Sequence, residues 1–489
     1  MLKLSNTLSG RKDVFEPLVP GVVRMYVCGV TVYDYCHLGH ARSALVFDVL
    51  RRYLEYSGLS VEFVKNFTDV DDKIIQRANE QGVSCDAVTA KYIAAYYEDM
   101  GRLGVRRAWK EPRATEHMAD IIALIETLMA KGLAYRVNGD VYFSVERYPD
   151  YGRLSKRKLA ELQAGARVEV DERKRHPMDF ALWKSSKPGE PWWQSPWGQG
   201  RPGWHIECSA MSMKHLGGTF DIHGGGMDLI FPHHENEMAQ SSGSTGKDFA
   251  RYWVHNGFVQ INQEKMSKSL GNFFTIREIF EKSDWPEEVT GEMLRYFLLA
   301  THYRSPLDFS DQSLTEAKNA LNGFYDLFYR LGEADRVKGQ GDTSLRAVLE
   351  QAHLGFSQAM DDDLNTPAAL AEMQKLRNEV NKLMADGLSV EGRQAARQEF
   401  ARLGDVLGLF QLDRWQFNPV LKARASDHVS AMDETSVVLN EAEIQKQIDE
   451  RNEARRRRDF KKADEIRQRL ASQGITIEDR PDGTSRWKR

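Results

Sequence analysis

Hydrophobic positions near the N-terminus switch from a strand-like to a helix-like spacing and back. Branched and aromatic residues fill residues 22–28, which predicts a β-strand followed at once by Gly29. Apolar residues then recur at helical spacing across residues 39–57, and residues 61–67 again have the composition of a strand. Strand, helix and strand within about 45 residues form a βαβ unit. We therefore expect an α/β fold with a parallel sheet and a right-handed crossover.

A second α/β stretch begins near residue 204. Residues 220–223 have the pattern of a strand that runs into three glycines, residues 234–240 that of a short helix, and residues 252–261 that of one further strand. Between the two α/β stretches lies an insertion with one amphipathic helix and a loop rich in tryptophan and proline. The sheet is therefore expected to combine two separated parts of the chain.

The rest of the chain is predominantly helical. Its periodicity predicts a helix bundle, then a turn-rich linker, then a charged helical stretch at residues 441–470. The predicted divisions are 1–111 for the first half of the α/β domain, 112–202 for the insertion, 203–285 for the second half of the α/β domain, 286–411 for the bundle, 412–440 for the linker and 441–489 for a small C-terminal domain.

Composition narrows the class of protein. At 489 residues the chain is longer than a single hydrophobic core usually supports, so several domains are expected. The N-terminal segment carries Lys3 and Arg11 without an apolar core between them, and the most apolar helical stretch is short and contains Glu126. Neither a secretory signal nor a membrane span is expected. Four cysteines are too few to cross-link such a chain, which favours a reducing cytoplasm.

Four thiol, imidazole and carboxylate side chains form a candidate metal set. They are Cys28, Cys208, His233 and Glu237. His233 and Glu237 are four residues apart, so on a helix they share one face. Zinc accepts thiolate, imidazole and carboxylate together and can keep one position open for a substrate. The spacing alone also fits two buried thiols with a surface His–Glu pair, and His234 is an alternative to His233.

Two short motifs contain residue types that a bound nucleotide requires. HLGH, at residues 37–40, lies at the turn into the first predicted helix, where free N–H groups and the helix dipole favour phosphate. KMSKS, at residues 265–269, follows a predicted strand and suits a loop whose lysines neutralise a triphosphate. Taken singly, each motif also fits an ordinary role, as polar helix caps or as a solvated loop.

Together and in this order, HLGH and KMSKS resemble the paired signatures of class I aminoacyl-tRNA synthetases. Several longer stretches are similar to the cysteinyl-tRNA synthetase family. They are residues 25–42, 66–74, 203–211, 220–241 and 264–274. The similarity extends over essentially the whole chain, with small departures at Leu38 and Met227. It implies a Rossmann-type parallel-sheet catalytic domain with an inserted subdomain, an α-helical bundle and a small anticodon-binding domain, with ATP at the carboxyl edge of the sheet.

The resemblance also implies an activity. It is the ATP-dependent ligation of L-cysteine to tRNA(Cys) through a cysteinyl-adenylate, with AMP and diphosphate released. One Zn²⁺ held by Cys28, Cys208, His233 and Glu237 would select the cysteine thiolate over the hydroxyl of serine, and Mg²⁺ would accompany ATP. A cytoplasmic monomer without membrane association is implied as well.

The family pattern assigns further site residues. Those expected to act in catalysis are His37, His40, Lys265 and Lys268. Those expected to bind ATP are His37, Gly39, His40, Lys265, Met266, Ser267, Lys268 and Ser269. Those expected around the amino acid are Gly29, Thr31, Thr68, Trp204 and His223. Considered by itself, Trp204 would also fit the role of an aromatic residue in the hydrophobic core.

The C-terminal stretch has its own charge pattern. Residues 451–469 hold nine basic and four acidic side chains, which suits phosphate contacts but also a solvated helix with internal ion pairs. In the resemblance this segment binds the anticodon, and an exposed Trp487 is expected to stack on an unpaired base. Two alternatives remain: a cysteine ligase that joins the adenylate to an amino-sugar in thiol synthesis, and a non-catalytic zinc protein that binds nucleic acid.

Overall fold

The computed structural model describes most of the chain. The described residues are 1–159, 173–261, 264–265, 274–332, 341–412, 441–457, 459–471, 475–479 and 485–488. They fall into two compact units, one of residues 1–282 and 291–411 and the other of residues 283–290 and 412–489. The predicted linker lies almost wholly outside the described residues. Among the described helices, none combines the length and apolar character needed to cross a bilayer.

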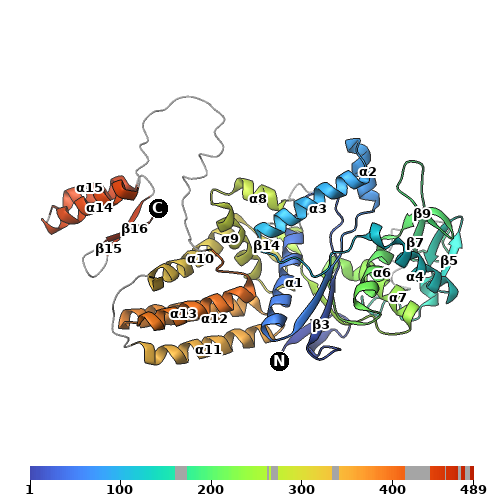
Figure 1. Ribbon diagram of the computed structural model, residues 1–489, viewed down its shortest axis with the longest axis horizontal. Coiled ribbons are helices and arrows are strands. Elements are labelled where there is room, and N and C mark those ends of the chain that lie inside the picture. The colour runs from blue at the N-terminus through green and yellow to red at the C-terminus, as the bar shows by residue number, and fades with distance from the viewer. Residues whose placement is uncertain are drawn as a thin grey trace. The chain divides into compact units, whose positions relative to one another are not determined.

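A four-stranded parallel sheet forms the centre of the first unit. Its strand order is β11-β10-β3-β4, with bounds Ala250–Asn256, Phe220–Gly226, Val22–Val27 and Ser60–Lys65. Helix α1, Leu38–Tyr56, connects β3 to β4 and lies beside the sheet (Figure 1). The predicted βαβ unit is confirmed. Because β3 pairs with β10, the two separated parts of the chain share one sheet and one carboxyl edge.

The strand predicted at residues 252–261 is wrong as a single element. β11 ends at Asn256, and β12, Val259–Ile261, belongs to a second sheet with β13, Glu264–Lys265, and β14, Leu307–Phe309. The break falls at Gly257, where an added Cβ would lie 2.6 Å from the backbone oxygen of Arg304. Only glycine permits this close approach, which moves the chain from one sheet to the other.

Two helices and a hairpin flank the central sheet without having been predicted. Helix α2 spans Asp72–Gln81 and α3 spans Cys85–Arg102, while β1, Lys3–Asn6, pairs with β2, Arg11–Val14. Short helical turns lie at Ala114–His117 (η1), Val145–Arg147 (η2), Met227–Leu229 (η3) and Ile230–His234 (η4). Helix α2 is only ten residues long and buries three side chains, so few apolar positions mark it in the sequence.

The insertion contains the predicted amphipathic helix and an antiparallel sheet. Helix α4, Met118–Ala130, confirms the first expectation. The expected Trp- and Pro-rich loop is correct only in part, because residues 193–195 and 198–202 form strands while residues 186–192 lie outside any strand. The five-stranded order is β5-β6-β7-β9-β8, with bounds Ala134–Val137, Asp140–Phe143, Phe180–Ser185, Gly198–Pro202 and Trp193–Ser195. Strands this short show too little alternation to be recognised, and their core position is fixed by fully buried Trp183.

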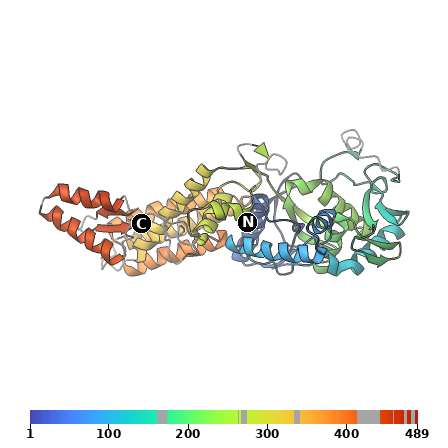
Figure 2. The ribbon, with the colours of Figure 1, turned by 90° about the horizontal axis from the view of Figure 1, so that it is seen from above.

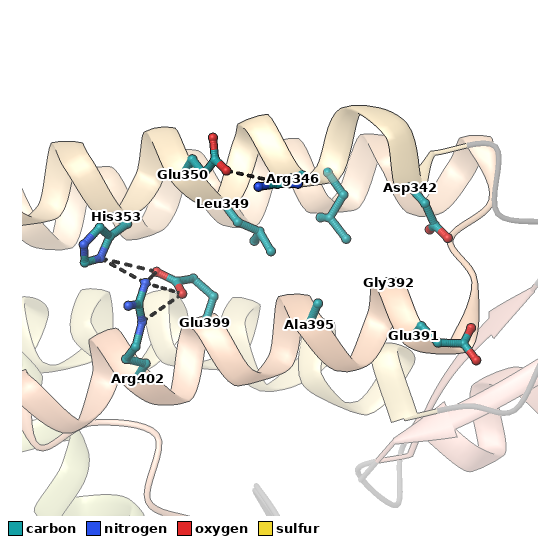
Figure 3. A pocket seen from close by; sticks show the side chains of 11 residues that line it. Asp342, Arg346, Leu349, Glu350, His353, Glu391, Gly392, Ala395, Glu399 and Arg402 are labelled. Atoms are coloured by element: carbon teal, nitrogen blue, oxygen red, sulfur yellow. Dashed lines mark hydrogen bonds and ion pairs between the residues drawn. The ribbon is translucent and has the colours of Figure 1, made fainter.

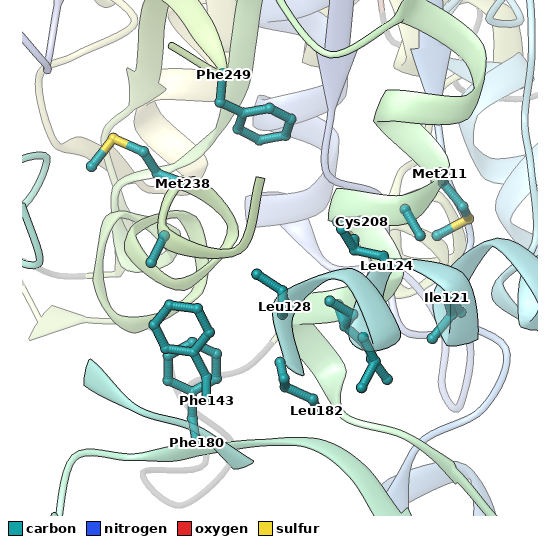
Figure 4. Packing of buried hydrophobic residues seen from close by; sticks show 14 of the residues in the cluster. Ile121, Leu124, Leu128, Phe143, Phe180, Leu182, Cys208, Met211, Met238 and Phe249 are labelled. Atoms are coloured by element: carbon teal, nitrogen blue, oxygen red, sulfur yellow. The ribbon is translucent and has the colours of Figure 1, made fainter. Parts of the chain in front are cut away.

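Helix α4 joins the insertion to the second half of the α/β domain. Its Ile121, Leu124 and Leu128 belong to one buried cluster with Cys208 and Met211 (Figure 4). The last two residues lie on α6, Trp204–Leu216, which is followed after β10 by α7, Glu235–Thr245. Cys208 is therefore buried, and part of its surroundings is the packed apolar cluster.

Helices follow the central sheet, as predicted. The bounds are Ile276–Lys282 (α8), Glu287–Leu299 (α9), Asp311–Gly332 (α10), Asp342–Asp361 (α11), Thr366–Asp386 (α12) and Val390–Leu407 (α13). Helices α10 to α13 lie side by side in Figure 1. A groove of about 490 Å³ runs between α11 and α13, with His353, Glu399 and Arg402 joined at one end (Figure 3). Its lining contains no predicted site residue.

The second unit contains a small α/β module. The predicted single helical stretch is two helices, α14, Glu441–Arg456, and α15, Phe460–Ala471, which lie side by side in Figure 2. A hairpin of β15, Thr476–Asp479, and β16, Ser485–Lys488, follows. Trp487 pairs with Ile477 and packs on the apolar cluster of this module, so it is partly buried rather than exposed as expected.

Candidate active site and metal centre

The four predicted metal ligands come together in the structure. Cys28 follows β3 directly, Cys208 lies on α6, His233 on η4 and Glu237 on α7. One donor atom from each lies within 4.8 Å of all the others, and all four residues are buried. Sγ of Cys28 is 3.1 Å from Glu237 Oε1 and 3.5 Å from His233 Nε2, and His233 Nε2 is 3.0 Å from Glu237 Oε1. Four donors thus converge on a single point.

The electrostatics of this cluster suit a cation. Burial raises the pKa of the Cys28 thiol well above its usual range, and Cys208 and Glu237 add to the rise. Hydrogen bonding from Cys28 lowers the pKa of Cys208 to about 6. Burial alone would lower the pKa of His233, but Glu237 and Cys208 outweigh it and raise this pKa to about 10. Protons therefore hold together groups that would otherwise repel, and a divalent cation can replace those protons as the counter-charge.

Two further histidines surround Glu237. His223 Nε2 donates to Glu237 Oε2 at 2.9 Å and is fully buried, so it fixes the orientation of the carboxylate. His234 lies with its Nε2 3.9 Å from Glu237 Oε1, while its Nδ1 is 2.8 Å from His255 Nε2. His223 and His234 also form a second possible donor set with Cys28 and Glu237. Both the predicted ligand and its alternative are thus present at the cluster.

Trp204 stands at the rim of the cluster. Its side chain is 39% exposed, which excludes the alternative of a core aromatic residue. The ring centroid lies 4.4 Å from that of His233. A partly exposed indole above a buried donor cluster can cover a small ligand while leaving a path for entry.

A second set of predicted substrate contacts borders the cluster. The backbone N–H of Gly29 donates to Asn66 Oδ1 at 2.8 Å, and Asn66 Nδ2 donates to Thr68 Oγ1 at 3.4 Å. Sγ of Cys208 lies 3.7 Å from the same Asn66 Oδ1. Thr31 pairs with Thr68 through a parallel bridge. Asn66 was not predicted as a site residue, although it begins one of the stretches that carry the family resemblance.

The HLGH segment forms the start of α1. His37 is the N-cap residue, and its Nδ1 accepts from the backbone N–H of Gly39 at 3.0 Å. Nδ1 of His40 accepts from the backbone N–H of His37, and the two imidazoles stack with centroids 3.7 Å apart. Two imidazoles and a helix N-terminus therefore face the same place, which suits a phosphate.

Of KMSKS, only the backbone of Lys265 is described. Met266, Ser267, Lys268 and Ser269 lie outside the described residues. Lys265 pairs with Gln260 of β12. After the motif, Thr275 bridges to His37, and the backbone N–H of Ile276 donates to the carbonyl of Cys36 at 2.9 Å. Thr275 and Ile276 therefore lie against the start of the HLGH segment.

Comparison with known proteins gives the family. Residues 14–319 match the description "tRNA synthetases class I (C) catalytic domain", residues 355–411 a DALR domain, and residues 441–487 a cysteinyl-tRNA ligase anticodon binding domain. The cysteine–tRNA ligase of Geobacter sulfurreducens is 54% identical over 492 residues, covering 100% of this chain and 99% of that protein. The chain belongs to the cysteine–tRNA ligase family. A second cysteine–tRNA ligase, from Thermodesulfovibrio yellowstonii, is 50% identical over 502 residues, with 100% and 99% covered.

Solved structures of other class I synthetases share the fold of this cysteine–tRNA ligase family member. A methionyl-tRNA synthetase of Mycobacterium tuberculosis, in complex with methionyl-adenylate, has a TM-score of 0.56 at 16% identity, covering 79% of this chain and 89% of its own. Thermus thermophilus arginyl-tRNA synthetase has a TM-score of 0.52 at 13% identity, with 84% and 85% covered. The amino-sugar ligase and the non-catalytic zinc protein are not favoured by these comparisons.

Proposed function

We propose that this protein activates L-cysteine with ATP and transfers the cysteinyl group to tRNA(Cys), releasing AMP and diphosphate. The observation that carries the proposal is that one connection, the segment between β3 and α1, contains both Cys28 of the donor cluster and the HLGH helix start. The cluster suits a thiol and the helix start suits a phosphate. A substrate with a thiol and a carboxylate can therefore be placed with its carboxylate towards ATP.

We assign one Zn²⁺ to the cluster. Its ligands in this proposal are Cys28, Cys208, His233 and Glu237. Two thiols, an imidazole and a carboxylate make a donor set that zinc accepts. When bound, the ion supplies a thiophilic position that takes the substrate thiolate and discriminates against a neutral hydroxyl. We choose His233 over His234 because His233 Nε2 lies 3.0 Å from Glu237 Oε1, whereas His234 Nε2 lies 3.9 Å from the same oxygen.

The remaining predicted contacts hold the amino acid. Gly29, Thr31 and Thr68 border the cluster, and Trp204 covers it. We propose that these four residues orient the backbone of cysteine, so that its carboxylate points towards the α-phosphate of ATP. His223 acts indirectly, because its hydrogen bond orients the carboxylate of Glu237.

We propose that activation depends on charge stabilisation rather than on a covalent enzyme intermediate. The cysteine carboxylate attacks the α-phosphate, and His37 and His40 at the start of α1 stabilise the negative charge that develops. Lys265 and Lys268, together with Mg²⁺, neutralise the outer phosphates as diphosphate leaves. The other predicted ATP contacts are Gly39, Met266, Ser267 and Ser269, and their assignment rests on the family resemblance.

The C-terminal module is proposed to bind the tRNA anticodon. Phe460 begins α15 and is 60% exposed, and it follows Arg456 and Arg457, whose side chains are also largely exposed. Both arginines pair with Glu453, so part of the basic charge is internally neutralised. An exposed aromatic ring beside cationic side chains suits stacking on an unpaired base. We therefore assign this role to Phe460 in place of Trp487.

Three further points remain predictions. We propose that the protein acts as a monomer and in the cytoplasm, as the family resemblance implies. The six divisions of the chain given by the sequence also stay a prediction.

Metal analysis combined with cysteine-dependent ATP–pyrophosphate exchange tests the proposal. Cys208→Ser removes one donor, and we expect it to lose bound zinc and to lower exchange about a hundredfold or more. Cys85→Ser is the matched control, because Cys85 lies at the start of α3 outside the cluster. It should keep both zinc and exchange. A zinc-free protein that still prefers cysteine to serine would contradict the assignment.

A further inference from the structure

Arg42 connects the HLGH helix to two distant turns. It lies on α1, two residues after the motif, and is 1% exposed. Its Nη1 donates to the carbonyl of Phe258 at 2.7 Å, and its Nη2 donates to the carbonyls of His302 at 3.1 Å and Ser305 at 2.5 Å. One guanidinium thus binds three backbone oxygens from two segments that lie more than 200 positions away in sequence.

One of these segments leads into β12, the strand before KMSKS, and the other leads into β14, the neighbour of β12. Phe258 immediately precedes β12, and Ser305 precedes β14, the parallel neighbour of β12. On its other side β12 pairs with β13, which contains Lys265. Arg42 therefore fixes the distance between the start of α1 and the β12–β13 pair that contains Lys265.

The charge of Arg42 is not balanced within the described chain. Burial lowers its pKa to about 10, so the side chain stays charged at neutral pH. No carboxylate among the described residues forms an ion pair with it, and its Nε has no partner there. Arg52, on the same helix and 7% exposed, differs because its Nε donates to Asp48 at 2.9 Å.

We infer that Arg42 is a positioning residue for ATP: it holds the start of α1 at a fixed separation from the β12–β13 pair that contains Lys265, and its uncompensated charge favours an anionic ligand. The inference rests on the proposed function only for the identity of the nucleotide site. A buried cation that lacks a counter-ion is costly unless a ligand supplies the negative charge. Bound ATP supplies that charge, whereas the paired Arg52 needs no such ligand.

Calorimetric titration with ATP in the absence of cysteine, and exchange kinetics in its presence, test the inference. Arg42→Met removes charge and hydrogen bonds, and we expect the Kd and the KM for ATP to rise about tenfold or more, with the KM for cysteine within about twofold. Arg42→Lys keeps the charge but cannot reach all three carbonyls, so an intermediate effect is expected. Arg52→Met is the matched control: it should lower the melting temperature while the affinity for ATP stays within about twofold of the wild type.

Two outcomes would overturn the inference. One is an Arg42→Met protein that binds ATP as the wild type does, and the other is an equal loss of ATP affinity in Arg42→Met and Arg52→Met. If Arg42→Met fails to fold, Arg42→Lys provides the same comparison. If Arg42→Met weakens ATP binding as expected while the wild type shows no cysteine-dependent exchange, the positioning role is supported and the proposed amino acid specificity is refuted.

Discussion

Gly29→Ala tests whether the loops after β3 and β4 must touch. A Cβ on Gly29 would stand 1.5 Å from the backbone oxygen of Asn66, whereas real Cβ contacts essentially never fall below 3.0 Å. The two segments must therefore separate by at least 1.5 Å. The backbone bonds from Val32 N–H to the carbonyl of Thr68, and from Thr68 N–H to the carbonyl of Val30, both 3.2 Å, oppose this separation.

The magnitude follows from what the separation displaces. Two backbone hydrogen bonds contribute about 1 kcal/mol each, so we expect a loss of about 2 kcal/mol in the free energy of unfolding. Gly29 and Thr68 also border the donor cluster, and a misplacement of about 1 Å near reacting groups can cost about a hundredfold in rate. The expected result is a fall of about a hundredfold in kcat/KM for cysteine, with zinc retained.

Cysteine-dependent pyrophosphate exchange, metal analysis and urea unfolding measure these effects. The matched control is Gly101→Ala, because Gly101 lies on α3 and an added Cβ there would meet no atom within 4 Å. This control should be neutral or slightly stabilising. If Gly29→Ala retained wild-type kcat/KM for cysteine, the close approach of the two loops would not be required for activity, and the reasoning would be refuted.

Two further predictions concern stability and tRNA. Asp48 accepts from Arg52 and Arg295; burial alone would raise its pKa, but these arginines outweigh burial and lower the pKa below its usual value of 3.8. Asp48→Asn should therefore cost about 3–5 kcal/mol in urea unfolding at neutral pH. Wild-type Asp48 becomes protonated and neutral as the pH falls below 3.8 through its lowered pKa, so the difference in unfolding free energy between Asp48→Asn and the wild type should shrink there. A pH-independent difference would contradict the assignment. Phe460→Ala should raise the KM for tRNA about tenfold without changing pyrophosphate exchange, whereas Trp487→Ala should chiefly destabilise the C-terminal module; equal effects on the KM for tRNA would contradict the stacking role.

Some errors of the sequence-based expectations have a common origin. The run at residues 252–261 is rich in branched and aromatic residues on both sides of Gly257, and its break there is decided by carbonyl oxygens of Arg304 and Ser305. Trp487 stands between two basic residues, which suggested exposure, but pairing of β16 with β15 places it opposite Ile477 and against the apolar cluster. In each case, a partner distant in sequence or in the opposite strand overrides the local pattern.

The sequence by itself determined the βαβ start, the helical second half and the residue types of the site, because periodicity and short motifs are local properties. It also determined the family, since the similarity extends over the whole chain. Only the tertiary structure decided that β3 lies beside β10, which brings Cys28 to Cys208 and Glu237. Only the structure likewise showed that Asn66 and Arg42 join segments of the site. The physical reason is that these contacts depend on the order of strands in the sheet and on the positions of distant backbone carbonyls. The identity of a single side chain determines neither of them.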